Sequence, residues 1–503
     1  MLLFVLSLLS FGSRLPLSAQ ELHPELTVPA DEASEQPAAQ SSAEKLPGPV
    51  TLFGNWRVRS EAWDWFQPTS GENSYAYVHW LARTGLMQSR PGFDWLIEGA
   101  QDGIVGLPAN PNGPGVQGAL GQGGTYLTAN SNSRNNFSAF IKQAYLTGKF
   151  SHNSKLTVGR FVFNDGLEVK PRDPSLAQLV TSRISQRLLG ETPFAAVLRS
   201  FDGARWTSDS PRSNVTLLAV RPTQGAYQIN AMGELNIDVF YGSYTRQTNR
   251  PGSDSLLRIF GMGYLDERAG VVPVDNRSLA ARSSTPNHLH IGTYGANYVH
   301  VLHTQHSGQF DLVLWGALQN GSWGPLKQRA GAFAGEIGWQ PPVLRTIRPW
   351  FNAGYYFGSG DSNPNDDRHG TFFQALPTAR QYARFPIYDM ENSQDYYGSM
   401  NFRLPHTIVI RSDWHSVRLA DPADLWYSGG GAYSLTGFGY TGRAAGGARS
   451  LVNVADASFD APMGHGFGVT LYYGYALGKS VISTIYPAGQ SAQFGYIETT
   501  FRF

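Results

Sequence analysis

Cysteine is absent from the 503 residues, which excludes disulfide bonds, cysteine zinc sites and cysteine nucleophiles. Charge is also scarce, because Asp, Glu, Lys and Arg make up only 15% of the chain, whereas an ordinary globular protein has about 25%. After the first few residues, no run is long and apolar enough for a membrane-spanning helix. These absences exclude a disulfide scaffold and a helical membrane protein, and they leave export from the cell open.

Aromatic residues and glycine are abundant instead. Aromatics make up 13% of the chain, 56 Gly and 30 Pro are spread along it, and the mean hydropathy is −0.27. This composition fits many strands that have one apolar and one polar face. The net charge of +1 predicts no charged partner, and no patch indicates nucleic acid. Only seven of the 39 basic residues are lysine, and arginine suits fixed, forked binding of carboxylate or phosphate better than lysine does.

Residues 1–19 are predicted to be a signal peptide. The run "LLFVLSLLSFG" is apolar, and "LPLSA" ends in small residues before Gln20, as in the apolar region and cleavage site of an export signal. No Lys or Arg precedes the apolar run, so the start is atypical, and a short buried helix is the alternative. Residues 20–49 are rich in Glu, Pro, Ala and Ser with almost no apolar pattern, which predicts a disordered linker.

From residue 50 onward the pattern predicts one strand after another. Most candidates have roughly 10 to 15 residues, longer than the usual globular strand of about 5 or 6 and sufficient for a tilted membrane strand of about 9 to 11. The eighteen candidates lie near residues 51–65, 75–89, 92–103, 136–150, 154–164, 196–208, 213–222, 232–248, 254–264, 288–302, 308–320, 327–340, 346–358, 395–404, 407–418, 450–460, 465–477 and 491–503.

The connections between these strands alternate in length. Short ones hold turn residues, such as "SRPG" at 89–92, whereas long ones lie near 104–135, 165–195 and 359–394. An even number of strands with short turns at one rim and long loops at the other is the pattern of an outer-membrane barrel. A β-propeller would show a repeat of about 40 to 50 residues, and the sequence has none. Residues 50–503 are therefore predicted to form an all-β, transmembrane antiparallel β-barrel of about 18 strands in the bacterial outer membrane, with short periplasmic turns and long extracellular loops.

The cost of charge in lipid predicts which face of each strand lines the lumen. An Arg that points into lipid at the bilayer midplane costs roughly 2 to 4 kcal/mol, so strand arginines are expected to point inward. In the strand near 154–164, this rule places Arg160 and Asn164 inward, opposite Phe161 and Phe163. The same rule predicts lumenal positions for Arg57, Arg59, Arg83, Arg205, Asp238, Arg258, Arg348 and Arg411.

The predicted lumen therefore carries many arginines with fewer acidic residues among them. They cluster on the early strands, between residues 51 and 208, with few acids nearby. One interpretation is an electropositive conduit that desolvates and guides an anion. The alternative is a lumen of neutralising Arg–Asp and Arg–Glu pairs, which is common in porins.

One helix is predicted, over residues 172–190, within a long connection. In "RDPSLAQLVTSRISQRLLG", Asp173 is placed as the N-cap, Pro174 at the first helical position and Gly190 after the last apolar residue. Two positions are open for this helix. It either caps or enters the pore, where its loop would act as a gate, or it lies on the outer rim.

The last strand is predicted to close the barrel. In "FGYIETTFRF", residues 494–503, Phe501 and Phe503 fall on one face and Glu498 and Arg502 on the other. The phenylalanines are expected to face lipid, and the charged residues the lumen. The strand must pair with the first one to remove both open edges. A final Phe503 also resembles the signal by which the barrel-assembly machinery recognises its clients.

Two segments resemble the bacterial alginate export family. They are "IKQAYLTGKFSHNSKLTVGRFVFNDG", residues 141–166, and "VLRSFDGARW", residues 197–206. The resemblance implies an eighteen-stranded outer-membrane barrel that passes an anionic uronate polysaccharide outward through an Arg-lined constriction. It assigns that constriction to Arg160, Asp165, Arg199, Asp202 and Arg205. Two positions depart from the family's usual residues, since Lys142 stands in place of Arg and Leu198 in place of Gly.

Transport is therefore the predicted function: a monomeric, non-enzymatic channel, surrounded by outer-membrane lipid, for an anionic alginate-like polysaccharide. A general porin for small anionic solutes is the alternative. An outer-membrane hydrolase is a third hypothesis, because Asp413 and His415 would share a strand face, although no nucleophile is evident. His288 and His290 form a possible metal pair without an evident third ligand, so no metal or cofactor is predicted.

Overall fold

The computed structural model describes residues 50–150, 153–285, 287–344, 346–377, 384–429 and 431–503. The predicted signal peptide (1–19) and linker (20–49) lie outside the described residues. No helix in the described part of the chain has the length and apolar character needed to span a membrane.

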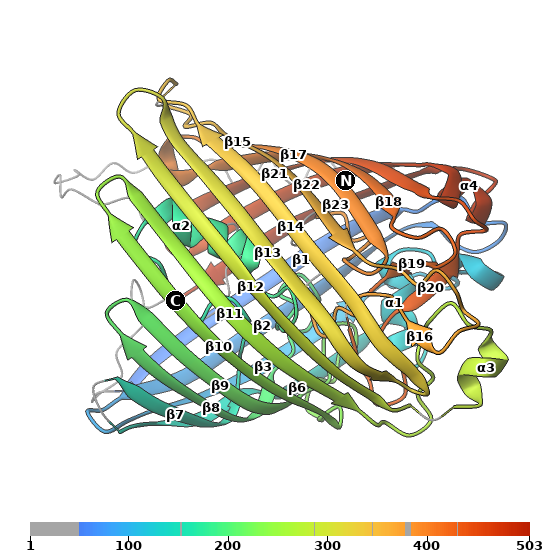
Figure 1. Cartoon of the computed structure of the whole chain (residues 1–503), viewed down its shortest axis with the longest axis horizontal. Coiled ribbons are helices and arrows are strands. Elements are labelled where there is room, and N and C mark those ends of the chain that lie inside the picture. Colours follow the sequence, from blue (N-terminus) through green and yellow to red (C-terminus); the bar gives the residue numbers. More distant parts are fainter. Residues whose placement is uncertain (1–49, 151–152, 286, 345, 378–383, 430) are drawn as a thin grey trace.

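Eighteen antiparallel strands form a closed barrel (Figure 1), which confirms the predicted fold class. Neighbouring strands pair in chain order, and the last pairs with the first. The strands are β1 (Val50–Asp64), β2 (Ser74–Ser89), β3 (Phe93–Val105), β6 (Asn136–Lys149), β7 (Ser154–Phe161), β8 (Phe201–Ser210), β9 (Ser213–Pro222), β10 (Ile237–Arg250), β11 (Ser253–Asp266), β12 (Leu289–Thr304), β13 (Gly308–Trp323), β14 (Leu326–Gln340), β15 (Trp350–Gly358), β17 (Ser393–Arg403), β18 (Val409–Leu419), β21 (Ser450–Gly464), β22 (Phe467–Gly478) and β23 (Ser491–Arg502).

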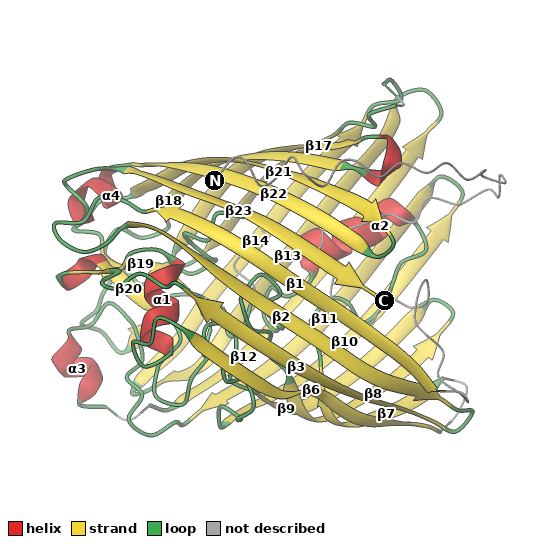
Figure 2. Cartoon of the chain, turned by 180° about the vertical axis from the view of Figure 1, so that it is seen from behind, coloured by secondary structure: helices red, strands yellow, loops and turns green. Residues whose placement is uncertain are grey.

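Smaller elements lie in the connections. They are β4 (Asn112–Gly113), η1 (Gly115–Gln117), β5 (Gly118–Ala119), α1 (Gln122–Ala129), α2 (Pro174–Leu179), η2 (Val180–Ile184), α3 (Leu279–Ser283), β16 (Arg368–His369), η4 (Pro405–Thr407), β19 (Leu425–Ser428), β20 (Thr441–Ala444) and α4 (Ser480–Ile485). Figure 2 shows α1, α3 and α4 gathered at the end of the barrel that carries the long loops. In an outer-membrane barrel this end is extracellular, and the short turns are periplasmic.

Closure joins the two terminal strands as the sequence predicts. The backbone N–H of Gly54 donates to the Phe503 carbonyl at 3.0 Å, and the N–H of Phe503 donates to the Gly54 carbonyl at 3.2 Å. The Trp56 ring contacts both Phe501 and Phe503 edge-on, with centroids 5.9 and 5.7 Å apart. No edge of the sheet remains between β1 and β23, which is the requirement for a sheet in lipid.

Side chains alternate between the lumen and the outer face along the strands. On β1, Trp56 and Val58 are 45% and 51% exposed, whereas Arg57 and Arg59 are buried inside. On β11, Leu257 and Ile259 are exposed and Arg258 is buried. This confirms the predicted inward direction of the arginines on these two strands, because lipid accepts the apolar face and the filled lumen accepts the charged one.

The predicted strand boundaries were wrong where the chain leaves the barrel wall. The strand expected at 196–208 begins only at Phe201, and the one expected at 154–164 ends at Phe161. Residues 194–198 are apolar and buried, but they pack inside the lumen rather than against lipid. An apolar stretch has the same composition in either place, so the sequence pattern could not separate the two.

Candidate functional site

Between β7 and β8 the chain leaves the wall and fills the lumen. Residues 162–200, which we call the lumenal segment, connect Phe161 to Phe201 and are largely buried. The segment contains α2 and the π-helical turn η2, and Figure 1 shows α2 inside the barrel. The helix predicted at 172–190 therefore enters the pore and does not lie on the outer rim.

The start of this helix is as predicted, and its end is not. The Asp173 carboxylate accepts a hydrogen bond from the Leu176 N–H at 2.8 Å, and Pro174 occupies the first turn. The helical part ends at Ile184 rather than at Leu189. Residues 188 and 189 instead donate their N–H groups to the Asp165 carboxylate, at 3.0 and 2.9 Å. A side chain near β7 thus replaces the helical carbonyls as acceptor and ends the helix early.

Asp165 also anchors the lumenal segment to the wall at β11, four strands from β7. Its carboxylate pairs with the Arg258 guanidinium of β11 at 2.9 Å, and Glu168 approaches the same guanidinium at 3.5 Å. Glu168 in turn accepts a hydrogen bond from the Tyr241 hydroxyl. Burial raises the pKa of the Asp165 carboxyl, and the positive charge of Arg258 opposes that rise. Arg258 is therefore a lumenal residue, as predicted, with two carboxylate partners.

Arg57 and Arg59 on β1 hold the returning part of the segment. Arg57 donates to the carbonyls of Pro193 and Ala195, the latter at 2.5 Å. Arg59 donates to the Phe194 carbonyl at 2.7 Å and lies 4.0 Å from the centre of the Phe194 ring. Three consecutive carbonyls of the lumenal segment are thus bound by two wall arginines.

Glu498 of β23 is the carboxylate partner of this arginine pair. It approaches Arg59 at 2.5 Å and Arg57 at 3.8 Å. One carboxylate therefore serves two guanidinium groups, and Glu61 of β1 lies a further 3.5 Å from Arg59.

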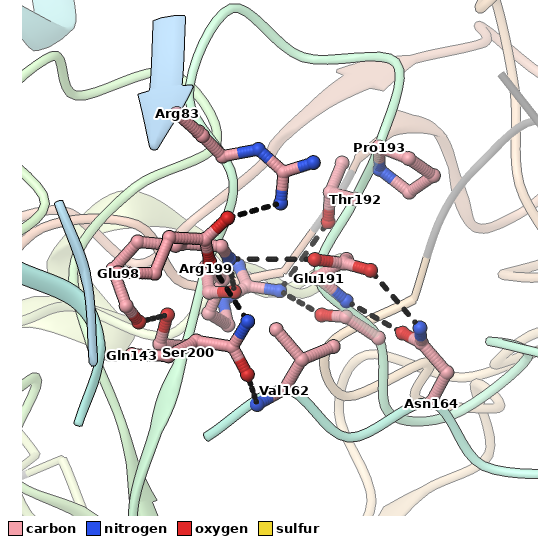
Figure 3. A network of polar contacts seen from close by, with 12 residues as sticks. Arg83, Glu98, Gln143, Val162, Asn164, Glu191, Thr192, Pro193, Arg199 and Ser200 are labelled. Carbon is pink, nitrogen blue, oxygen red and sulfur yellow. Dashed lines mark hydrogen bonds and ion pairs between the residues drawn. The ribbon is translucent and has the colours of Figure 1, made fainter. Parts of the chain in front are cut away.

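A polar network links β2, β3 and β6 to the lumenal segment (Figure 3). Arg83 lies 3.7 Å from Glu98, which accepts a hydrogen bond from Gln143 at 2.8 Å. Asn164 and Glu191 bond to each other through side chain and backbone at 3.1 and 3.0 Å. These contacts tie the two ends of the segment together at the point where it enters and leaves the lumen.

Lys142, where the family usually has Arg, belongs to the same network. Its ammonium group lies 3.3 Å from Glu191 and donates to the Arg199 carbonyl at 2.6 Å. The cation at this position therefore holds the lumenal segment from the wall of β6.

Arg199 and Arg205 are the cations of the second matched motif. Arg199 is fully buried and donates to the carbonyls of Gly190 and Ala432, at 3.2 and 2.6 Å. Burial lowers the pKa of Arg199 to about 10, so it is charged at neutral pH. Arg205 lies over the Phe161 ring at 5.3 Å. Among the described residues, no carboxylate forms an ion pair with either guanidinium.

A polar cavity lies between η2 and the wall, close to the periplasmic mouth. Its volume is about 20 Å³, and its lining includes Arg183, Glu336, Asn352 and Arg411. Arg183 pairs with Glu336 at 2.9 Å, and Arg411 pairs with Asp413 at 2.6 Å. A space of this size holds about one water molecule.

The predicted orientation of Arg160 and Asp202 was wrong. Arg160 shares its face of β7 with Val158, which is 51% exposed, whereas Phe161 is buried inside. Asp202 lies opposite Arg160 on β8 and pairs with it at 2.6 Å. The pair therefore sits on the outer face of the wall. It is partly shielded there, because Arg160 also donates to the Met232 carbonyl at 2.9 Å.

Two further inward predictions were wrong. Asp238 shares the outer face of β10 with Phe240 and pairs there with Arg221 at 2.6 Å. Arg348 is exposed in the connection before β15 and is not part of a strand. Asp238 stays outside the lumen because Arg221 pairs with it, and Arg348 stays outside because it lies in a turn. The rule based on the cost of charge in lipid considered neither an ion pair nor a turn.

The weaker sequence signals have other partners than expected. His415 bonds to Asp395 at 2.7 Å, not to Asp413, and Asp395 also accepts from the Tyr388 hydroxyl at 2.6 Å. His288 and His290 lie 3.0 and 2.8 Å from Glu267. This carboxylate is the third group that the sequence did not reveal, and it gives both imidazoles a hydrogen-bond partner.

Sequence reasoning did not select four charged residues that hold the segment: Lys142, Arg183, Arg187 and Glu191. Arg187 lies over the Trp315 ring at 5.1 Å and donates to the Arg183 carbonyl at 2.6 Å. The spacing of Arg183 and Arg187 was a usable signal, since residues four apart share one side of a helical turn. Two cations there favour a polar environment over lipid.

A family model described as alginate export matches residues 122–473. No curated protein matches the chain. Solved structures share its fold at low identity. Pseudomonas aeruginosa OccK9 (OpdG) has a TM-score of 0.57 and 10% identity, over 90% of this chain and 98% of that one. Acinetobacter baumannii OccAB2 has a TM-score of 0.55 and 10% identity over the same shares. The outer membrane protein opdK of Pseudomonas aeruginosa has a TM-score of 0.52 and 9% identity, again over 90% and 98%.

Proposed function

This chain belongs to the alginate export family and is a channel of the bacterial outer membrane, and we propose that it conducts an anionic, uronate-type polysaccharide through its arginine-lined lumen. The observation that carries the proposal is the type of acceptor that the lumenal arginines use. Arg57, Arg59 and Arg199 donate to main-chain carbonyls of the lumen-filling loops, and Arg57 and Arg59 also share the Glu498 carboxylate. The carbonyl acceptors are neutral, and a carboxylate forms stronger bonds with guanidinium.

A polymer with one carboxylate per sugar would exchange with these carbonyls one at a time. Each exchange replaces a neutral acceptor with a charged one, while the lumenal segment gives up a bond that it regains when the polymer has passed. Binding at several weak sites in sequence lets a charged chain move without being trapped. The segment is then both the closed gate and the temporary occupant of the sites that the polymer uses.

The two parts of the segment have different roles in this proposal. Its base is fixed by the Asp165–Arg258 ion pair, in which both charges are buried. Its returning part begins with a second buried ion pair, Lys142–Glu191, and beyond it residues 193–195 are held through their own carbonyls. Opening then moves the stretch after Glu191 first, because its bonds can be replaced by a substrate whereas the two buried ion pairs cannot.

A general porin for small anions is the second candidate. A P. aeruginosa OpdK structure with vanillate has a TM-score of 0.52 with 9% identity, and vanillate is a small carboxylate. This observation suits small solutes, for which a limited movement of the segment is enough.

Planar-bilayer conductance of the purified protein tests the proposal. We expect anion selectivity, block of the current by oligouronates and lower selectivity in Arg57→Gln and Arg205→Gln. Arg329→Gln is the matched control, since Arg329 is exposed on the outer face near the extracellular end of β14. Heat-modifiable gel mobility verifies that each variant is folded.

The outcomes separate the candidates. Cation selectivity, or anion selectivity that both lumenal variants leave unchanged, would overturn the arginine mechanism. Block by small organic acids but not by oligouronates would favour the small-anion porin.

A further inference from the structure

The outer wall of β10, β11 and β12 carries a polar pocket near the periplasmic turns. Its volume is about 360 Å³, and its lining includes Arg246, Arg250, Ser255, Leu257, Tyr298 and His300. These residues lie on the exposed face, because Leu257 and Ile259 are 43% and 56% exposed and Arg258 between them is buried. The pocket therefore opens to the lipid side of the barrel. We call it the β10–β12 pocket.

The strand register brings the pocket together from three neighbouring strands. Arg246 lies opposite Leu257, which lies opposite Tyr298. In the next row toward the periplasmic turns, Ser255 lies opposite His300. The Tyr298 and His300 rings stack with their centroids 6.0 Å apart. Two aromatic rings thus form one side of the pocket, and arginines form the other.

The two arginines have no internal counterion. In the described part of the chain, no carboxylate forms an ion pair with Arg246 or Arg250. The nearest acid along β11, Asp254, shares the face of Arg258 and bonds to Asn249 at 2.6 Å. The Nδ1 atom of His300 is enclosed and also lacks a hydrogen-bond partner among the described residues. The pocket is therefore a positive site with free donors.

Its depth corresponds to the lipid headgroup region. Arg250 lies at the periplasmic turn, and Arg246 lies four residues earlier on β10. Four residues rise about 13 Å along a strand, or about 10 Å along the membrane normal at a tilt of about 40°. Arginine side chains at this level reach the interface with their guanidinium groups and leave their methylene groups in the apolar layer.

An apolar strip of the wall, which we call the glycine path, continues from the pocket toward the membrane centre. Gly242 and Gly261 lie opposite each other on the outer face, and Gly261 faces Tyr294 on the next strand. Tyr244 and Ile259 flank the glycines on the periplasmic side, and Tyr294 is 57% exposed. The Tyr294 ring covers Gly261 and the Leu217 side chain covers Gly242, so the strip is a flat apolar surface at the height where acyl chains begin.

We propose that the β10–β12 pocket binds the phosphate of a glycerophospholipid from the periplasmic leaflet, with an acyl chain along the glycine path. Arginine forks match phosphate oxygens in two parallel hydrogen bonds. Seryl and tyrosyl hydroxyls at the rim supply further donors, and Leu257 contacts the glycerol and first methylenes. The occupant follows from charge and position: the pocket is positive, it faces lipid, and phosphate is the anion that lipid presents at this depth.

Native mass spectrometry of the full chain in detergent tests this proposal. The probes are phosphatidylglycerol, phosphate-free diacylglycerol of the same chain length, and glycerol 3-phosphate. Arg246→Gln/Arg250→Gln removes the two cations. Lys327→Gln/Arg329→Gln is the matched control, because both residues are exposed on the outer face of β14 at the extracellular end. Gel mobility with and without heating verifies folding of both double variants.

We expect wild type and control to retain one phosphatidylglycerol, and the double variant to bind it roughly thirtyfold more weakly, from about 1 kcal/mol for each cation near an anionic surface. Equal retention in the double variant would overturn the proposal. Equal binding of diacylglycerol would show that the phosphate is not recognised. Equal binding of glycerol 3-phosphate would show that the acyl path is not used and that the ligand is a soluble phosphate.

Discussion

The strands of the barrel differ in length from one side to the other. β12, β13 and β14, which we call the tall wall, have 16, 16 and 15 residues. β7, β8 and β9, which we call the low wall, have 8, 10 and 10. On the tall wall the strands run from the periplasmic turns to the extracellular side without interruption. On the low wall the strands stop early, and the chain between β7 and β8 turns into the lumen. The loss of wall height and the filling of the pore are therefore two results of one departure from regular structure.

The two walls also differ in how they place charge. On the tall wall, exposed residues at mid-strand are apolar, such as Tyr294, Leu314 and Leu318. On the low wall, the inner face carries Arg205 and the outer face carries the Arg160–Asp202 pair. A paired charge on the outer face costs less than a single one, because the attraction between the two ions offsets part of their desolvation cost. The low wall is thus the region in which both the inner and the outer face carry charged side chains.

The largest effect on conduction is expected when the lumen beside the low wall is emptied. Replacing residues 174–190 with Gly and Ser in equal number removes α2 and η2 but keeps Asp165 and residues 191–200. We expect a folded barrel with steady, several-fold larger single-channel currents, because the side chains that close the periplasmic half are gone. Planar-bilayer recording measures this. Currents equal to those of the wild type would show that other loops close the channel.

A disulfide that fixes the lumenal segment to the wall is expected to lower the current. Val197 in the lumenal segment and Ala226 after β9 form an isolated antiparallel bridge. Bridged antiparallel residues have Cα atoms about 4.5 to 5.5 Å apart, which suits a disulfide. Since the chain has no cysteine, Val197→Cys/Ala226→Cys can form only this bond. We expect oxidation to suppress the current and a reductant to restore it. The single Val197→Cys variant, which cannot form the bond within one chain, is the control.

The two walls also differ in how much of their structure could be predicted from the sequence. All eighteen strands were found, since alternation along β1 or β11 reports lipid on one face and the lumen on the other. The face of Arg160 was assigned wrongly, because the cost of charge in lipid applies to a single charge and Asp202 follows only in another strand. The network around Arg199 could not be derived either. Its partners Gly190 and Ala432 are backbone carbonyls, which carry no signal in a sequence.

A milder variant weakens the returning part of the lumenal segment. In Arg59→Gln/Glu498→Gln both members of a buried pair become neutral, while Arg57 loses its longer contact with Glu498 and Glu61 keeps His79 as a partner. The bond from Arg59 to the Phe194 carbonyl is weakened. A hydrogen bond to a charged group contributes about 1.5 to 3 kcal/mol, so the open fraction should rise roughly tenfold or more. Single-channel recording gives this fraction. An unchanged open fraction would mean that Arg59 does not hold the gate.

The smallest effect on conduction is expected from the outer face of the low wall. Arg160→Ala leaves Asp202 unpaired, and Asp202→Ala leaves Arg160 unpaired, whereas the double variant removes both charges. We therefore expect each single variant to lower the free energy of unfolding by about 1 to 3 kcal/mol, and the double variant to lose less than the sum. Denaturant titration of the reconstituted barrel measures this. Anion selectivity should stay at the wild-type value in all three variants, unlike in Arg205→Gln on the inner face of the same wall. A drop in selectivity on loss of Arg160 would place this residue back in the conduction path, and it would remove the distinction between the two faces of β7 and β8.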